Sequence, residues 1–148
     1  MPKSTGTCNS ILALMYNTTT WANVAINATA APLTKVYTSL HTAALTPATG
    51  TQEDVETVYT DYVRVETDRD TSGTGWKVPV AGVTKNNGQI QFHVCGVSGA
   101  TLKYVATGTT ASGNAGLVWH YGQLNSDLAV SNGITPQFAA EQLTITET

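Results

Sequence analysis

The stretch that decides the fold is Ser131-Asn132-Gly133-Ile134-Thr135-Pro136-Gln137-Phe138-Ala139-Ala140-Glu141-Gln142-Leu143-Thr144-Ile145-Thr146. Its Asn-Gly pair tolerates positive φ and predicts a tight turn, while Pro136 removes a backbone donor and keeps Thr135 extended. Leu143 and Ile145 then alternate with threonines, which is typical of a strand with one apolar and one polar face. The stretch carries no catalytic group and therefore indicates architecture rather than chemistry.

The composition narrows the class of protein. With 148 residues the chain suits a single domain, 1–148, which can bury roughly 70% of the surface that its unfolded form exposes. Charged residues make up only 11% of the chain and the net charge is -3, so we expect no binding to nucleic acid or to an anionic membrane. Threonine is the commonest residue, which favours β-structure.

The cysteines and the N-terminal residues indicate the cell compartment in which the protein is made and assembled. Cys8 and Cys95 lie far apart and lack the spacing of metal ligands, so we expect two free, buried thiols. The apolar run from Ile11 to Tyr16 is too short to span a membrane, and no small-residue cleavage pattern follows it. We therefore expect a protein that is made and assembled in the cytoplasm, with residues 1–9 forming a flexible polar arm.

Alternating apolar and polar residues predict a series of short strands. The expected strands are 35–42, 58–67, 76–80, 89–94, 101–107, 117–123, 128–130 and 143–148, with turns at 68–75, 87–88 and 98–99. Before them, Ser10 is expected to cap a short helix over 10–17. This pattern indicates a mainly β fold, namely an antiparallel β-sandwich or jelly-roll-like barrel over 35–148, with the short N-terminal helix and the polar N-terminal arm.

Aromatic residues in this pattern are expected to form the core. Trp119 and Tyr121 share a face of one expected strand, and that face should line the core with Trp76 and Phe92 as packing partners. The alternative use for Trp119 is stacking against a carbohydrate.

Three segments along the chain share a pattern with a known family. They are Val36-Tyr37-Thr38-Ser39-Leu40-His41-Thr42-Ala43, Tyr59-Thr60-Asp61-Tyr62-Val63-Arg64-Val65 and Asn132-Gly133-Ile134-Thr135-Pro136-Gln137-Phe138-Ala139-Ala140. They resemble, in the same order, the "LHTA" strand, the "Y-x-G-Y-A-R-V" strand and the "NG-x-x-P-x-F-A-A" turn of small tailed-bacteriophage virion proteins, commonly labelled phage tail fibre proteins. The chain departs from that pattern where Asp61-Tyr62 replaces Gly-Tyr, and in its longer alanine-rich entry before Pro32. The resemblance spans nearly the whole chain.

The resemblance implies a structural role in the virion. Similar small β-proteins also resemble capsid cement or decoration proteins, and this chain has neither the heptads nor the repeats of a fibre shaft. We therefore expect first a cement protein that binds the outer surface of the phage head and stabilises capsomer junctions. Its partners would be the major capsid protein and copies of itself, as a symmetric dimer or trimer. The alternatives are a tail or tail-fibre component for host attachment, with tail proteins as partners, and a carbohydrate-binding or carbohydrate-degrading module.

The expected mechanism is binding, and two regions supply candidate contacts. The candidate partner-interface residues are Pro2, Lys3, Ser4, Thr5, Glu53, Asp54, Glu56 and Arg64. We expect residues 1–7 to order only on the capsid, because they are polar and lack a pattern. Arg64 is expected to pair with Glu66 or another acid across the sheet. A more specific hypothesis is that Arg64 forms a buried salt bridge between subunits.

Enzymatic and metal-binding patterns are weak. Three histidines fall on the polar sides of expected strands, where a metal site is conceivable, but they lack ligand spacing. They are His41, His93 and His120. Asp68-Arg69-Asp70 begins like a calcium loop, but Pro79 stands where the bidentate glutamate should be. Gly96-Val97-Ser98-Gly99 lacks the final spacing of a serine elbow. We therefore expect no enzyme activity, no metal and no cofactor.

Overall fold

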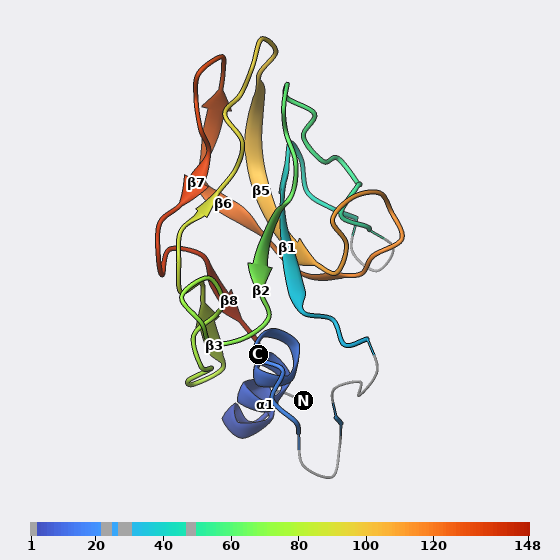
Figure 1. Cartoon of the computed structure of the whole chain (residues 1–148), viewed down its shortest axis with the longest axis vertical. Helices are drawn as coiled ribbons and strands as arrows, with labels where there is room; N and C mark the ends of the chain where they lie inside the picture. The colour runs from blue at the N-terminus through green and yellow to red at the C-terminus, as the bar shows by residue number, and fades with distance from the viewer. Residues whose placement is uncertain (1–2, 22–24, 27–30, 47–49) are drawn as a thin grey trace. The chain divides into compact units, whose positions relative to one another are not determined.

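A computed structural model of the chain describes residues 3–21, 25–26, 31–46 and 50–148. One helix, α1 (Thr5–Tyr16), precedes a series of strands in the described residues (Figure 1). The strands are β1 (Lys35–His41), β2 (Val65–Asp68), β3 (Val83–Lys85), β4 (Ile90–Gln91), β5 (Ala100–Gly108), β6 (Val118–Val130), β7 (Gln137–Phe138) and β8 (Thr144–Thr146). The β1–β5, β5–β6 and β3–β8 pairs are antiparallel. The predicted fold class, a sandwich-like, mainly β fold with one short N-terminal helix, is confirmed.

The chain divides into two compact units, each built from segments that are distant in sequence. Unit 1 consists of Met1–Lys35, Thr67–Ile90 and Phe138–Thr148. Unit 2 consists of Val36–Glu66 and Gln91–Gln137. The proposal that residues 1–148 form a single domain stays a prediction.

The largest sheet has four strands in the order β2-β1-β5-β6, and two-stranded sheets pair β3 with β8 and β4 with β7. Pairing between β5 and β6 is interrupted by a register shift, because Leu102 lies opposite Leu128 whereas Tyr104 lies opposite Gln123. The extra residues of β6 form a bulge, a device that bends a strand without ending it. The two strands predicted over 117–123 and 128–130 are therefore parts of one long strand.

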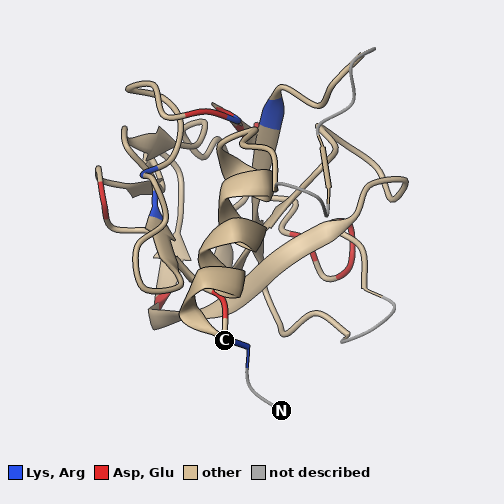
Figure 2. Cartoon of the chain, turned by 90° about the horizontal axis from the view of Figure 1, so that it is seen from below, with Lys and Arg blue, Asp and Glu red and all other residues tan. Residues whose placement is uncertain are grey.

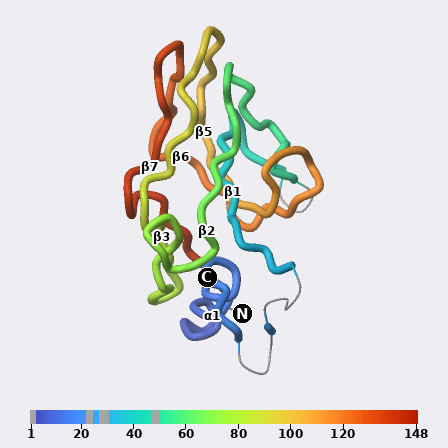
Figure 3. Tube along the Cα trace, in the orientation of Figure 1, coloured from blue at the N-terminus to red at the C-terminus, as the bar shows by residue number. Residues whose placement is uncertain are grey.

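Unit 1 is held by aromatic packing on α1. Cys8, Leu12 and Tyr16 follow each other at intervals of one helical turn and are all buried. The ring of Tyr16 lies 4.7 Å from that of Trp76 between centroids, and the Trp76 indole N–H donates to Thr67 Oγ1 at 3.0 Å. Trp76 thus packs on α1, within unit 1. The C-terminal end of the chain lies beside α1 (Figure 3).

The helix begins earlier than predicted. Ser4 is its N-cap, since the Ser4 hydroxyl accepts a hydrogen bond from the Thr7 N–H at 3.2 Å. The expected short helix is present, but its predicted start at residue 10 is wrong, and the expected flexible arm is wrong for residues 5–9, because these residues are the first part of α1. Gly6 has a poor helix propensity, so the sequence pattern does not predict a helical turn at this residue. The Ser4 cap and the burial of Cys8 compensate for that poor propensity.

Unit 2 has its own apolar core. The buried apolar side chains of this unit are Val36, Leu40, Leu45, Tyr59, Phe92, Cys95, Leu102, Val105, Ala106 and Val130. Tyr62 stacks on Phe92 with ring centroids 6.1 Å apart, and Tyr59 meets Tyr62 edge-on at 5.2 Å. Cys95 is a free, buried thiol, as is Cys8 in unit 1, which confirms the prediction for both cysteines.

Several expected strands are shorter, and one predicted core face is exposed. The strand expected over 58–67 is reduced to β2, because a turn at Thr60-Asp61 precedes it, with Asp61 at a φ of 72°. The strands expected over 76–80 and 89–94 shrink to isolated bridges and to β4. In β6, Trp119 is only half-buried and Tyr121 is 43% exposed, so this strand does not line the core as predicted.

We expect Ala81→Asn to stabilise unit 1. Ala81 and Gly82 have φ values of 52° and 76° and form a tight turn, in which the N–H groups of Val80 and Val83 donate to each other's carbonyls. Asn-Gly is the preferred pair for such a turn, because asparagine tolerates left-handed φ better than alanine. The urea midpoint should rise, because asparagine relieves part of the ~1–2 kcal/mol that a left-handed residue costs. Ala81→Val is the control and should lower the midpoint; a rise with valine would contradict the argument.

Candidate interaction site around Arg64

The acidic segment runs beside β1 in unit 2. The Thr57 N–H donates to the Leu40 carbonyl at 2.9 Å, and the Thr42 N–H donates to the Val55 carbonyl at 3.0 Å. Val55 has a φ of 46°, an uncommon conformation for a β-branched residue. These contacts and this turn aim the side chain of the next residue, Glu56, toward Arg64.

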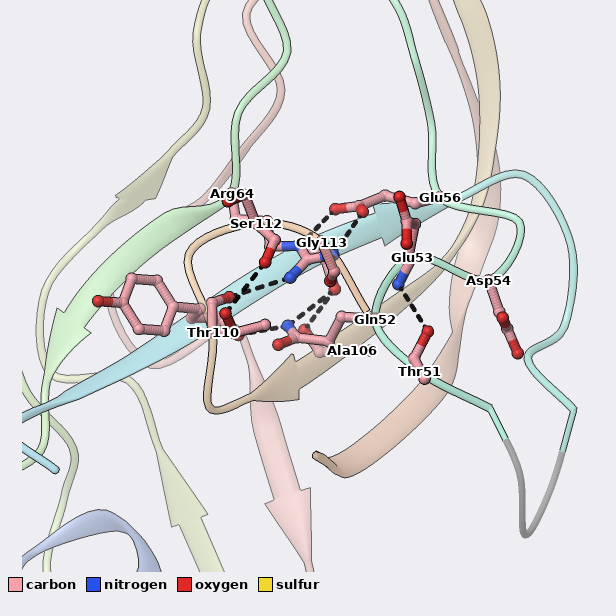
Figure 4. Close-up of polar contacts among 12 residues, drawn as sticks. Thr51, Gln52, Glu53, Asp54, Glu56, Arg64, Ala106, Thr110, Ser112 and Gly113 are labelled. Carbon is pink, nitrogen blue, oxygen red and sulfur yellow. Dashed lines mark hydrogen bonds and ion pairs between the residues drawn. The ribbon is translucent and has the colours of Figure 1, made fainter. Parts of the chain in front are cut away.

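Arg64 and Glu56 form a bidentate ion pair (Figure 4). Arg64 Nε lies 2.8 Å from Glu56 Oε1, and Nη2 lies 2.7 Å from Oε2. Only 2% of the Arg64 side chain and 13% of the Glu56 side chain is exposed. The geometry is that of the strongest protein ion pairs, and burial makes each charge dependent on the other.

The rest of the guanidinium holds a loop. Arg64 Nη1 donates to the Thr110 carbonyl and Nη2 to the Gly113 carbonyl, both at 3.0 Å. This loop connects β5 to β6, and its residues 111–115 are exposed. Through these two hydrogen bonds, Arg64 attaches the exposed loop to the residues directly before β2.

Tyr62 completes the network on the Glu56 side. The Tyr62 hydroxyl donates to Glu56 Oε1 at 2.7 Å and accepts from the Leu40 N–H at 3.0 Å. Burial, and then the neighbouring Glu56 carboxylate, raise the pKa of Tyr62 above its ordinary value, so the phenol remains a donor. A shallow depression beside the network is lined by Glu53, Glu56, Thr57, Val58, Tyr62, Val63, Arg64, Ala111, Ser112 and Gly113.

The structure corrects the predicted partner of Arg64. Arg64 is expected to pair with Glu66 or another acid; the acid is Glu56 of the same chain, so the pair is neither the one with Glu66 nor one between subunits. The turn before β2 explains this, because it folds the residues ahead of Arg64 back onto the acidic segment. Of the other predicted acids, Glu53 is exposed and Asp54 is half-buried.

The predicted N-terminal contact residues belong to unit 1, whereas Arg64 and the predicted acids belong to unit 2. Pro2 lies outside the described residues. Lys3 Nζ pairs with Glu147 Oε1 at 3.0 Å, Ser4 caps α1, and Thr5 is the first helical residue. The hypothesis of an arm that orders only on a capsid is therefore wrong for residues 3–7.

A second buried network on β1 was missed by the sequence analysis. The Ser39 hydroxyl lies 2.9 Å from His41 Nε2, and His41 Nδ1 lies 2.9 Å from the Asp54 carbonyl. Gln52 Nε2 donates to Ser39 Oγ at 3.1 Å and to the Tyr37 carbonyl at 2.9 Å. Ser39, His41 and Gln52 are all 0% exposed. Substrate cannot reach this Ser–His pair, and its contacts fasten the acidic segment to β1.

The position of His41 differs from expectation, although a signal is present in the sequence. The strand pattern predicts His41 on a polar, exposed side, whereas the side chain is fully buried. Ser39 and His41 lie two positions apart and so share a face of β1. Two polar residues on one face of a strand indicate a buried polar network when another segment covers that face.

We expect His41 to make stability depend on pH. Burial lowers the pKa of His41 below its ordinary value of 6.5, although hydrogen bonding to Asp54 and the charge of Glu56 act in the opposite direction. The unfolded chain therefore binds more protons than the folded chain, and stability falls as the pH drops through 6.5. The urea midpoint should be lower at pH 5 than at pH 7.5. His41→Asn should reduce that difference, and an unchanged difference would remove His41 as its cause.

The described part of the chain gives little support for metal binding or for a membrane-spanning helix. There, no group of three or more His, Cys, Asp or Glu side chains could hold a metal ion. No described helix is long and apolar enough to cross a membrane. Charged residues are few and scattered over the ribbon (Figure 2).

The fold and the site define a mainly β protein in which buried polar and charged side chains serve to hold loops. Residues 13–146 match the family model described as Podophage GP4 fiber I protein gp80. This match covers most of the chain, and the chain belongs to that family of phage virion structural proteins. This match confirms the resemblance to a family of phage virion structural proteins that the sequence indicated. No curated protein matches the chain.

Proposed function

We propose that this chain is a non-enzymatic subunit of a phage tail fibre that takes part in host attachment. The observation that carries the proposal is the match of residues 13–146 to a family described as a fibre protein. The site supports binding rather than chemistry, because its Ser–His pair is buried and its arginine is committed to loop carbonyls and to Glu56. This order reverses the expectation from the sequence, which placed a head cement protein first.

Decoration of the head is the second candidate. It is favoured by one observation, the lack of heptads and of shaft-like repeats in the sequence. In that case the chain would bind the major capsid protein on the outer surface of the head and stabilise capsomer junctions. Many weak contacts with the shell would add up to slow dissociation.

The position of the chain in the intact particle tests both candidates. We would image purified virions by cryo-electron microscopy and count copies of the chain by quantitative mass spectrometry against the major capsid protein. A tail-fibre subunit should give density at the tail and a copy number far below that of the capsid protein. Density over the head lattice with a comparable copy number would overturn the fibre proposal in favour of decoration.

A further inference from the structure

A depression of about 340 Å³ lies in unit 1, between α1, the segment that follows α1 and the segment before β3. The helix contributes Asn9, Ser10 and Ala13. Ala13 lies four residues after Asn9 and three after Ser10, so the three share one side of α1. Small side chains at Ser10 and Ala13 leave the room that larger residues would fill. The volume lies within the range of about 300–1,000 Å³ that is typical of small-molecule sites.

The segment after α1 brings Trp21 to this side of the helix. The N–H groups of Asn17 and Thr19 both donate to the Ala13 carbonyl, at 3.0 and 3.1 Å, so the chain turns back at the end of α1. Trp21 and Ala25 then exchange two backbone hydrogen bonds, both of 2.9 Å. These bonds fix the backbone of Trp21, and its half-buried side chain lines the depression.

The third wall consists of Val78 and Pro79, and a hydrogen bond attaches the turn after them to α1. The Gly82 N–H donates to Asn9 Oδ1 at 2.6 Å. Val78 is 65% exposed, so it presents an apolar surface at the rim of the depression. Backbone hydrogen bonds and this contact hold the walls in place before any ligand arrives. A ligand therefore loses little free energy in ordering the site.

The lining combines an aromatic ring with uncharged polar groups. Within the described residues, Asn9 Nδ2 and the hydroxyls of Ser10 and Thr20 have no hydrogen-bond partner. An apolar ligand would bury such groups without partners, which costs free energy. No Lys, Arg, Asp or Glu is among the described residues that line the depression, so an ion would lose water there without gaining a counter-charge. A sugar suits both features, because its C–H face can stack on an indole while its hydroxyls bond to amide and hydroxyl groups.

We propose that this depression binds a neutral saccharide of the host cell surface, with a sugar ring stacked on Trp21 and sugar hydroxyls bonded to Asn9, Ser10 and Thr20. The inference rests on the proposed function, host attachment by a fibre subunit, and it names the chemical class of the ligand. The site is distinct from the carbohydrate contact that the sequence suggested at Trp119, which belongs to unit 2. One shallow site binds weakly, and several copies together give firm attachment.

The test uses the purified full chain, immobilised in many copies on a sensor, and surface polysaccharide extracted from the bacterium on which the phage propagates. We would measure binding by biolayer interferometry. The wild type should bind, and equally at low and high salt, because no charge takes part. Trp21→Ala should bind at least about tenfold more weakly, the effect typical of truncating a tryptophan at the centre of a contact. Ser10→Leu should weaken binding similarly, because it fills the depression, and leucine is the better helix former.

The matched control is Trp119→Ala, which truncates a half-buried tryptophan of unit 2 and should bind like the wild type. Circular dichroism identifies variants that fail to fold, and Ser10→Leu decides the question if Trp21→Ala is one of them. Polysaccharide treated with periodate, which cleaves the vicinal diols of sugars, should no longer bind. A wild type that does not bind would overturn the proposal, as would folded Trp21→Ala and Ser10→Leu variants that bind normally. Such a result would leave the location of the chain in the particle, which tests the fibre function, untouched.

Discussion

Arg64→Met should destabilise unit 2 by ~3–5 kcal/mol, the cost of leaving one member of a buried ion pair without its partner. Methionine fills a similar volume but cannot neutralise Glu56 or donate to the carbonyls of Thr110 and Gly113. We therefore expect a large fall in the urea midpoint and faster amide exchange in the loop over 109–116. Both are measurable on the purified chain, the second by hydrogen exchange with mass spectrometry.

A double variant separates the ion pair from packing. Glu56→Gln/Arg64→Met removes both charges, and it should recover a large part of the stability lost in Arg64→Met. Glu66→Gln is the matched control for the partner that the sequence suggested, and it should change stability little because Glu66 is exposed. If Glu66→Gln were as damaging as Arg64→Met, the assignment of Glu56 as the partner would be wrong.

Arg69→Met should have an effect of similar size in unit 1. The Arg69 guanidinium donates to the Met15 carbonyl at 2.6 Å, to the Leu33 carbonyl at 2.9 Å, and to the Leu14 carbonyl. Leu14 and Met15 lie in the last turn of α1, whose carbonyls have no partner within the helix. Hydrogen bonds to charged groups contribute ~1.5–3 kcal/mol each, so we expect a loss of at least ~3 kcal/mol.

The loss should be localised at the C-terminal end of the helix. Amide exchange should accelerate over residues 13–17 and remain slow in β5, which belongs to unit 2. Arg69→Lys retains a positive charge but offers fewer donors in a different geometry, so it should recover only part of the stability. Full recovery with lysine would mean that charge at the helix terminus, rather than the set of hydrogen bonds, explains the effect.

Much of the fold was predictable because it depends on local patterns. The strand β1 and the body of β5 follow period-two alternation, and the loop after β5 is marked by glycine and asparagine. The failures have physical causes that a local pattern does not contain. A bulge carries β6 through residues 124–127, which look like a turn, and a serine cap lets α1 begin ahead of Gly6.

The candidate site was only partly predictable. Arg64 and Glu56 both stand out in the sequence as contact residues, but their pairing depends on the turn at Thr60-Asp61, where an aspartate adopts a left-handed conformation that glycine would adopt more readily. Likewise, Arg69 stands in a segment that resembles an ion-binding loop. Its actual partners are backbone carbonyls distant in sequence, and no side-chain pattern identifies such partners.

The interleaving of the two units makes unit 1 depend on both the first and the last residues of the sequence. Unit 2 ends at Gln137, whereas unit 1 needs Phe138–Thr148, in which Thr146, Ile145 and Thr144 pair with β3. Because the ribosome releases the N-terminal segments first, α1 and β3 must wait, incomplete, until β8 has emerged. The helix that is made first therefore stays without part of its unit until nearly the whole sequence has been translated.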